Sequence, residues 1–117
     1  MNKILLVGTI MTELELKEVG EDKIPLVNFT LEVNNGFNSI TKERIVDFLS
    51  VSAWNKNAEN LFRYSGKGHL VSIIGSLKSR SYKNAEGQTR YIPEVRAERI
   101  QFLDYKKSEN TSLNQII

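Results

Sequence analysis

Residues 45–77, IVDFLSVSAWNKNAENLFRYSGKGHLVSIIGSL, change their hydrophobic period twice. From about Ile45 to Trp54, apolar and polar residues alternate, as they do in a strand with one buried face. Residues 55–65 repeat their apolar positions at helical spacing, and two glycines then end that pattern. Alternation returns from about Leu70 to Tyr82. This stretch therefore predicts a strand, an α-helix and another strand.

The same periods assign each side chain of the stretch to the core or to the outside. The residues expected in the core are Leu49, Val51, Ala53, Ala58, Leu61, Phe62, Ser65, Val71, Ile73, Gly75 and Leu77. Those expected on the outer faces of the two strands are Phe48, Ser50, Ser52, Trp54, Ser76, Lys78, Arg80 and Tyr82. Two large aromatic residues thus share an outer face with serines, although large apolar side chains are usually buried.

Three further strands are expected around this stretch. The first runs from about Lys3 to Leu16, with a bend or bulge between Gly8 and Thr12. The second begins near Pro25 and alternates clearly. Its expected core residues are Val27, Phe29, Leu31 and Val33. The last runs from about Thr89 to Phe102, and its apolar residues change parity near Arg99, which predicts a bulge there.

Two polar segments separate strands of this pattern. We expect residues 34–43 to form a connection with a mobile hairpin tip and residues 83–88 to close a hairpin.

The resulting order of three strands, a helix and two strands is that of the OB-fold. We therefore expect an all-β, five-stranded OB-fold barrel with one α-helix between strands 3 and 4. The 117 residues suffice for one such domain, assigned to residues 1–106, and a short flexible C-terminal tail, residues 107–117.

Charge and composition exclude several classes of protein. Lys and Arg number 16 against 14 Asp and Glu, so net charge alone does not indicate a nucleic-acid partner, but six bases face three acids between Lys78 and Arg99. The chain has no Cys, and hence no disulfide or thiolate metal site, which suits a reducing cytoplasm. Residues 4–7 are too short for a signal peptide, and no apolar run approaches the roughly 20 residues of a membrane span. We expect a soluble, cytoplasmic protein.

Basic and aromatic residues alternate on the outer face of the strand that follows the helix. Lys78, Arg80 and Tyr82 share that face, and Phe48 and Trp54 share the outer face of the strand before the helix. Cations follow the phosphates of single-stranded nucleic acid, and aromatic rings stack on its bases. Exposed rings on strands also pair with each other or form oligomer interfaces, so any one ring is open to either interpretation. Their clustering on neighbouring barrel strands favours nucleic-acid binding.

Four short segments resemble the bacterial and phage single-stranded DNA-binding proteins over about residues 2–104: NKILLVG at 2–8, NFTL at 28–31, GSLKSRSY at 75–82 and GQTRY at 87–91. The resemblance implies a non-enzymatic OB-fold protein, without a cofactor, that binds single-stranded DNA irrespective of sequence in replication, recombination and repair. It also implies a homotetramer. The residues that fall at base-stacking positions of the family are Phe37, Phe48, Trp54 and Tyr82. Those at or near its basic contacts are Lys3, Lys78, Arg80 and Arg90.

The chain departs from this family pattern in three ways. Phe48 and Tyr82 stand where the well-known bacterial members have Trp, so the stacking rings are smaller. Leu49 stands where those members have a His that supports a subunit contact. The family's tail ends in an acidic tip with a terminal Phe, whereas this chain ends NTSLNQII. Recruitment of partner proteins through an acidic C-terminal tip is therefore not expected.

Two other functions are compatible with an OB-fold. One is a module that binds RNA or a partner protein in a replication or primosome complex, and the other is a small nuclease. Glu94 and Glu98 are expected to share a strand face, but Arg96 between them favours ion pairing over metal binding. His69 is the one His in the chain and has no metal-ligand neighbours. We therefore expect no catalytic residue, no metal site and no membrane partner.

Deletion of Ser108–Ile117 should leave the folding and the single-stranded DNA affinity of the protein unchanged. The segment has one Glu and no aromatic residue, so it offers neither stacking rings nor an acidic tip. Thermal melting and titration with dT oligomers check the two properties. An alternative is that Leu113, Ile116 and Ile117 dock on a partner as a short apolar anchor. Pull-downs from host lysate compare the full-length and truncated proteins, and partners lost only on truncation would show that the tail recruits them.

Overall fold

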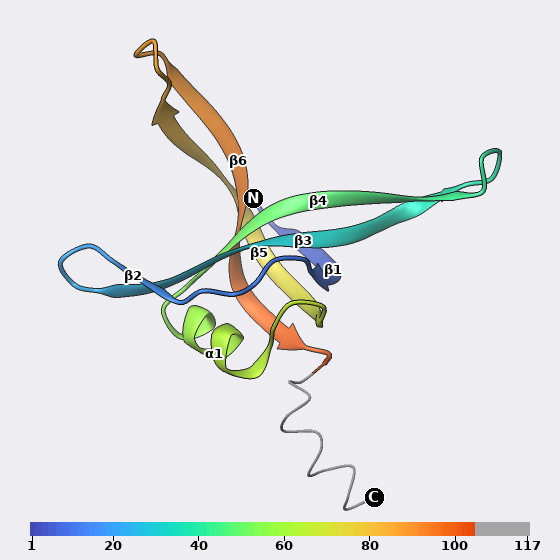
Figure 1. The fold of residues 1–117 in the computed structure, drawn as a ribbon, viewed down its shortest axis with the longest axis horizontal. Coiled ribbons are helices and arrows are strands. Elements are labelled where there is room, and N and C mark those ends of the chain that lie inside the picture. The colour runs from blue at the N-terminus through green and yellow to red at the C-terminus, as the bar shows by residue number, and fades with distance from the viewer. Residues whose placement is uncertain (105–117) are drawn as a thin grey trace, which may run out of the picture.

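A closed barrel of five strands forms the body of the protein (Figure 1). The computed structural model describes residues 1–104, and the strands there are β1 Ile4–Ile10, β2 Lys17–Val19, β3 Ile24–Asn38, β4 Glu43–Trp54, β5 Leu70–Lys83 and β6 Thr89–Phe102. A helix, α1 Lys56–Tyr64, lies between β4 and β5. This order confirms the predicted OB-fold with its helix between the third and fourth barrel strands. Within residues 1–104, no helix has the length and apolar character needed to cross a membrane. The predicted tail, 107–117, lies outside the described residues.

Strand pairing closes the barrel in the order β1, β5, β6, β4, β3 and back to β1. The neighbours β1 and β5, β5 and β6, and β3 and β4 are antiparallel. β4 and β6 are parallel, pairing Val51 with Val95 and Ser52 with Arg96. β1 pairs with β5 along its length and with β3 at its last two residues, and this double pairing closes the barrel.

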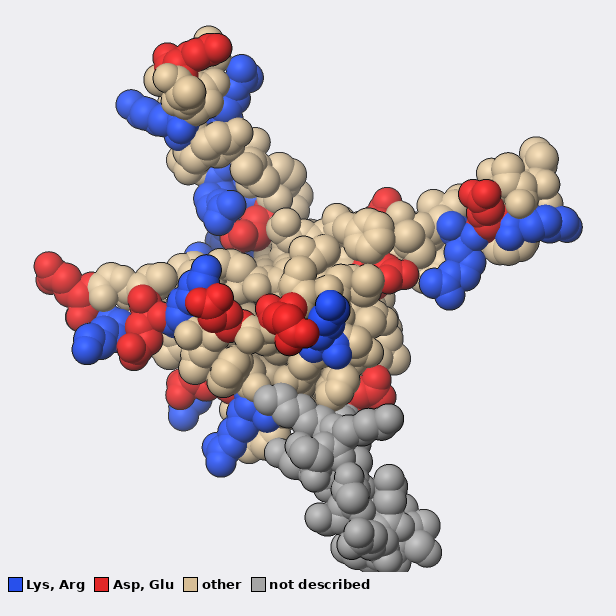
Figure 2. Space-filling model, in the orientation of Figure 1, with Lys and Arg blue, Asp and Glu red and all other residues tan. Residues whose placement is uncertain are grey.

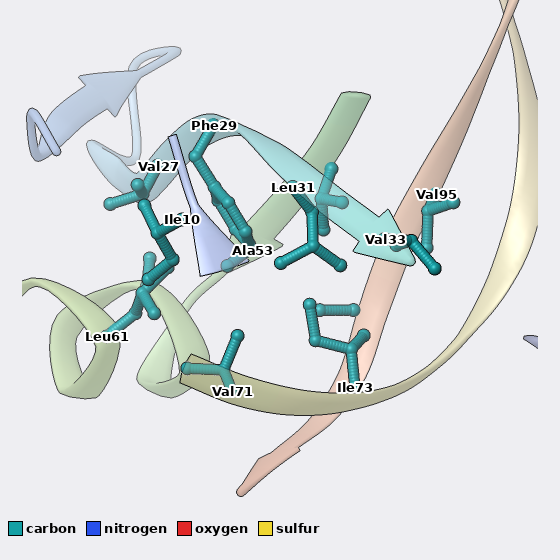
Figure 3. Packing of buried hydrophobic residues seen from close by; sticks show 13 residues of the cluster. Ile10, Val27, Phe29, Leu31, Val33, Ala53, Leu61, Val71, Ile73 and Val95 are labelled. Atoms are coloured by element: carbon teal, nitrogen blue, oxygen red, sulfur yellow. The ribbon is translucent and has the colours of Figure 1, made fainter. Parts of the chain in front are cut away.

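The barrel interior holds most of the residues that alternation assigned to it. Figure 3 shows side chains from β1, β3, β4, β5, β6 and α1 meeting in one apolar cluster. The predicted core residues that are buried are Val27, Phe29, Leu31, Val33, Val51, Ala53, Ala58, Leu61, Ser65, Val71, Ile73 and Gly75. Two predicted core residues are exposed instead. Phe62 is 40% exposed because the buried face of α1 is narrower than predicted and contains only Ala58 and Leu61. Leu77 is 48% exposed because β5 extends out of the barrel after Ser76.

Two hairpins extend well beyond the barrel, as Figure 1 shows. β3 stays paired with β4 as far as Asn38 and Glu43, so most of the segment predicted as a connection is strand, and the turn occupies only 39–42. The hairpin of β5 and β6 turns at 84–88, which confirms the predicted tip. We call residues 34–46 the β3–β4 arm and residues 77–95 the β5–β6 arm.

The first strand is shorter than predicted. β1 ends at Ile10, and a separate strand, β2, pairs with the beginning of β3. The sequence did not reveal β2 because only three residues pair there, and their side chains are mostly exposed. The predicted bend between Gly8 and Thr12 falls where β1 passes from β5 to β3.

The bulge predicted near Arg99 is confirmed. Ile74 pairs with Arg99 but Gly75 pairs with Ala97, which leaves Glu98 as an extra residue on β6. An extra residue exchanges the two faces of a strand. The apolar residues on either side of it therefore all reach the core, namely Val95, Ala97, Ile100 and Phe102.

Replacing Gly8 with Ala should destabilise the barrel, whereas replacing Gly66 with Ala should not. A Cβ on Gly8 would collide with the backbone carbonyl oxygen of Glu32, on the strand against which β1 closes. Such overpacking costs on the order of 1–3 kcal/mol. At Gly66, in the loop after α1, an added Cβ meets nothing within 4 Å. Urea unfolding at one fixed protein concentration measures both variants, and equal midpoints for Gly8→Ala and wild type would contradict the steric account.

Candidate nucleic-acid interface

The outer surface of β3 and β4 forms the floor of a polar cavity. Thr30 lies opposite Ser50 and Asn28 lies opposite Ser52, so small polar side chains occupy the centre of this surface. The cavity measures about 310 Å³ and is lined by Thr12, Asn28, Phe29, Thr30, Ser50, Val51, Arg80 and Glu94. Its donors and acceptors suit the edge of a base, and Arg80 brings a cation suited to a phosphate.

The β5–β6 arm carries the predicted basic and aromatic residues on one face. Lys78, Arg80 and Tyr82 alternate along β5, and Tyr82 lies opposite Arg90 of β6. The parallel pairing of β6 with β4 makes this face continuous with the floor of the cavity. We call the combined surface the outer sheet face and define it by Asn28, Thr30, Phe48, Ser50, Trp54, Lys78, Arg80, Tyr82, Arg90, Glu94 and Arg96.

Phe37 joins the same side of the sheet through an irregularity in the β3–β4 arm. Asn34 pairs with Val46 but Phe37 pairs with Arg44, so two residues of β3 stand against one residue of β4. This shift moves Phe37 to the side of Arg44, which is also the side of Phe48. Phe37 and Phe48 are 57% and 60% exposed, and both rings are therefore open to a stacking partner.

Trp54 is the least exposed of the four predicted aromatic residues. Its indole Nε1 donates a hydrogen bond of 3.2 Å to Ser52 Oγ. The guanidinium of Arg96 lies over the indole, 4.9 Å from the ring centroid. One face of the predicted stacking ring is thus already occupied by a cation from the neighbouring strand.

Two of the four predicted basic residues form ion pairs with acidic side chains. Arg80 Nη1 lies 3.9 Å from Glu94 Oε1, on the outer sheet face. Lys3 Nζ lies 3.2 Å from Glu98 Oε1, beside the bulge of β6. Lys3 lines a different cavity, shared with Ile74, Glu98 and Arg99. The structure therefore brings seven of the predicted site residues onto one side of the sheet but leaves Lys3 apart from them.

The ion pairing predicted for Arg96 with Glu94 and Glu98 is wrong. Glu94 pairs with Arg80, Glu98 pairs with Lys3, and Arg96 covers Trp54. The bulge separates the two acids, because Glu98 is the extra residue and no longer shares the face of Glu94. Within residues 1–104, no group of three or more His, Cys, Asp or Glu side chains could hold a metal ion.

Sequence reasoning missed Thr12 and Arg96 as residues of this surface. Thr12 reaches the cavity because its Oγ1 accepts a hydrogen bond of 3.1 Å from the backbone N–H of Thr30. Arg96 reaches the outer sheet face through the pairing of β6 with β4, and the local sequence does not reveal that pairing. A weak signal was present, since Arg96 belongs to the basic stretch between Lys78 and Arg99.

Comparisons with known proteins agree with the fold. Single-stranded DNA-binding protein 1 of Clostridium acetobutylicum is 40% identical over 107 residues, which cover 92% of this chain and 97% of the relative. The single-stranded DNA-binding protein of Staphylococcus aureus is 39% identical over 111 residues, which cover 95% of this chain and 70% of the relative. The model of the Single-strand binding protein family matches residues 1–103, and with these relatives it shows that the chain belongs to that family.

Proposed function

We propose that the protein binds single-stranded DNA on its outer sheet face, irrespective of sequence, and protects exposed strands during replication, recombination and repair. The observation that carries this proposal is the continuity of one surface, on which Lys78, Arg80 and Tyr82 lead from the arm to the polar cavity. Cations there can follow phosphates while rings stack on bases. Every base presents a π-face, so such binding needs no particular sequence. Membership of the single-strand binding protein family supports the same function, which is binding rather than catalysis.

The two arms lengthen the path available to a DNA strand. Figure 2 shows Lys and Arg side chains along both arms, each arm also carrying acidic side chains. Phe37 and Phe48 lie along the hairpin of β3 and β4, and Tyr82 and Arg90 lie on the β5–β6 arm. The cavity between them is lined from both hairpins. A strand running from one arm to the other would cross the cavity, and its phosphates would replace Glu94 as the partner of Arg80.

We also propose that the protein assembles as a homotetramer in the bacterial cytoplasm. The outer surface of β1 supports assembly, because Leu5 and Val7 are 74% and 54% exposed there. The β1 edge that faces away from β5 pairs with β3 only at Thr9 and Ile10, among the described residues. A free strand edge beside exposed apolar side chains is suited to pairing with a second copy of the chain. The bacterial source of the relatives supports the location.

Substitutions on the β5–β6 arm should separate stacking from charge. Tyr82→Ala should weaken binding of a dT oligomer by about 1–3 kcal/mol and leave its salt dependence unchanged, because a ring is lost but no cation. Lys78→Met should instead flatten the slope of log affinity against log salt by about 0.7, the value for one phosphate on a single strand. Fluorescence anisotropy of a labelled dT oligomer measures both quantities.

The arm supplies matched controls for these two variants. Tyr91 lies opposite Ser81 on the other face of the arm and is more exposed than Tyr82, 68% against 47%. Lys83, opposite Thr89, lies on that other face too. Tyr91→Ala and Lys83→Met should bind nearly as wild type does, and larger losses there than on the outer sheet face would refute the assigned surface. Tighter binding of matched RNA than of dT would favour an RNA-binding module.

Leu5→Glu should reduce the assembly to smaller species, because an unpaired carboxylate in an apolar contact between subunits is costly. Leu16→Glu places the same charge at a site that is 37% exposed and belongs to the loop before β2 rather than to β1, and it should leave the mass unchanged. Multi-angle light scattering of both variants and of the wild type measures the mass. The proposed contact is wrong if Leu5→Glu keeps the wild-type mass.

A further inference from the structure

Arg96 is a cation of the outer sheet face that forms no ion pair with an acidic side chain of residues 1–104. The ion pairs found within residues 1–104 are Lys3–Glu98, Arg44–Glu32 and Arg80–Glu94, and Arg96 takes part in none of them. Its contact is with the indole of Trp54, 4.9 Å from guanidinium to ring centroid. A guanidinium carries five N–H donors, and a stacking contact uses none of them. Arg96 therefore keeps its donors available to a ligand.

The sheet beneath Arg96 is built to let its side chain lie flat. Arg96 stands between Ser52 of β4 and Ser76 of β5, its pairing partners on either side. Both serines are short, and they are 0% and 7% exposed. Ser52 Oγ also accepts the hydrogen bond from the indole of Trp54, at 3.2 Å. The ring and the guanidinium are thus held in place relative to each other by the same pair of strands.

We propose that Arg96 and Trp54 form one composite nucleotide-binding platform, in which Arg96 presents the binding surface and Trp54 supports it from behind. A guanidinium plane stacks on a base much as an aromatic ring does, and its edge donates hydrogen bonds to a phosphate. One side chain can therefore contact both the base and the phosphate of a nucleotide. Trp54 is then a positioning residue, since Arg96 covers the face of its ring. This inference rests on the proposed binding of single-stranded DNA by the outer sheet face.

A second Arg–aromatic contact in the protein offers a matched control. The guanidinium of Arg63 lies over the ring of Tyr64, 5.5 Å from its centroid. This pair sits at the end of α1 rather than on the outer sheet face. The substitution Arg63→Met thus removes the same charge and the same kind of contact at a place where no DNA is expected.

The test is titration of a labelled dT oligomer over a series of salt concentrations, using the full chain. Arg96→Met should lower affinity about tenfold or more through the lost stacking, and flatten the salt slope by about 0.7 through the lost phosphate contact. Arg96→Lys should keep the slope and still lose affinity, because it retains the charge but not the plane. Arg63→Met should match the wild type in both. The chain has one Trp, so a changed emission spectrum of unbound Arg96→Met reports the loss of the guanidinium from Trp54.

The possible outcomes are distinguishable. Wild-type affinity and slope in Arg96→Met would overturn the platform, while dT binding by the wild type would still stand. A loss of affinity with an unchanged slope in Arg96→Met would also overturn it, because Arg96 would then only brace Trp54. Should Arg96→Met fail to fold, Arg96→Lys decides, and wild-type affinity in that variant would refute a role for the guanidinium plane. Failure of the wild type to bind dT would refute the proposed function itself.

Discussion

The parallel pairing of β4 with β6 is the contact on which the rest of the structure depends. Its two residue pairs, Val51 with Val95 and Ser52 with Arg96, join the antiparallel strands β3 and β4 to the antiparallel strands β5 and β6. Parallel neighbours cannot be linked by a tight turn, and here the chain passes through α1 and β5 between them. The connecting helix packs Ala58 and Leu61 into the core on its way. The pairing of β4 with β6 thus both closes the barrel and determines where the helix lies.

The same pairing determines the chemistry of the outer sheet face. On β4 it presents small serines, and on β6 it presents Arg96 and Glu94. The serines leave room above the sheet, which the indole of Trp54 and the guanidinium of Arg96 occupy. Glu94 meets Arg80 across β5 and β6, at the edge of the polar cavity. Among the ion pairs of residues 1–104, the surface thus holds one cation paired with an acid, Arg80, and others in no ion pair, of which Arg96 lies over Trp54.

In the two arms, the strands extend beyond the closed barrel and most of their side chains are exposed. Beyond the closed part, each hairpin keeps its hydrogen-bonded partner but loses the facing strands that would bury one side. Leu77 and Tyr91 have the parity of core residues and are nevertheless exposed. Both faces of an arm are then open to a ligand, and the identity of the side chains decides which face binds. On the β5–β6 arm, the cations Lys78 and Arg80 distinguish the outer face.

Local sequence by itself determined the five barrel strands, the helix, the bulge near Arg99 and the face on which most side chains lie. This was possible because parity along a strand is a property of the backbone, which requires no knowledge of the neighbouring strand. It also placed the aromatic and basic residues of the outer sheet face, apart from Arg90 and Arg96. The tertiary structure alone decided where the barrel ends, which left Leu77 exposed, and which strands meet, which brought Arg96 to Trp54 and took Lys3 to Glu98. The physical reason is that burial and contact depend on the register between strands distant in sequence, and closure of the whole barrel sets that register.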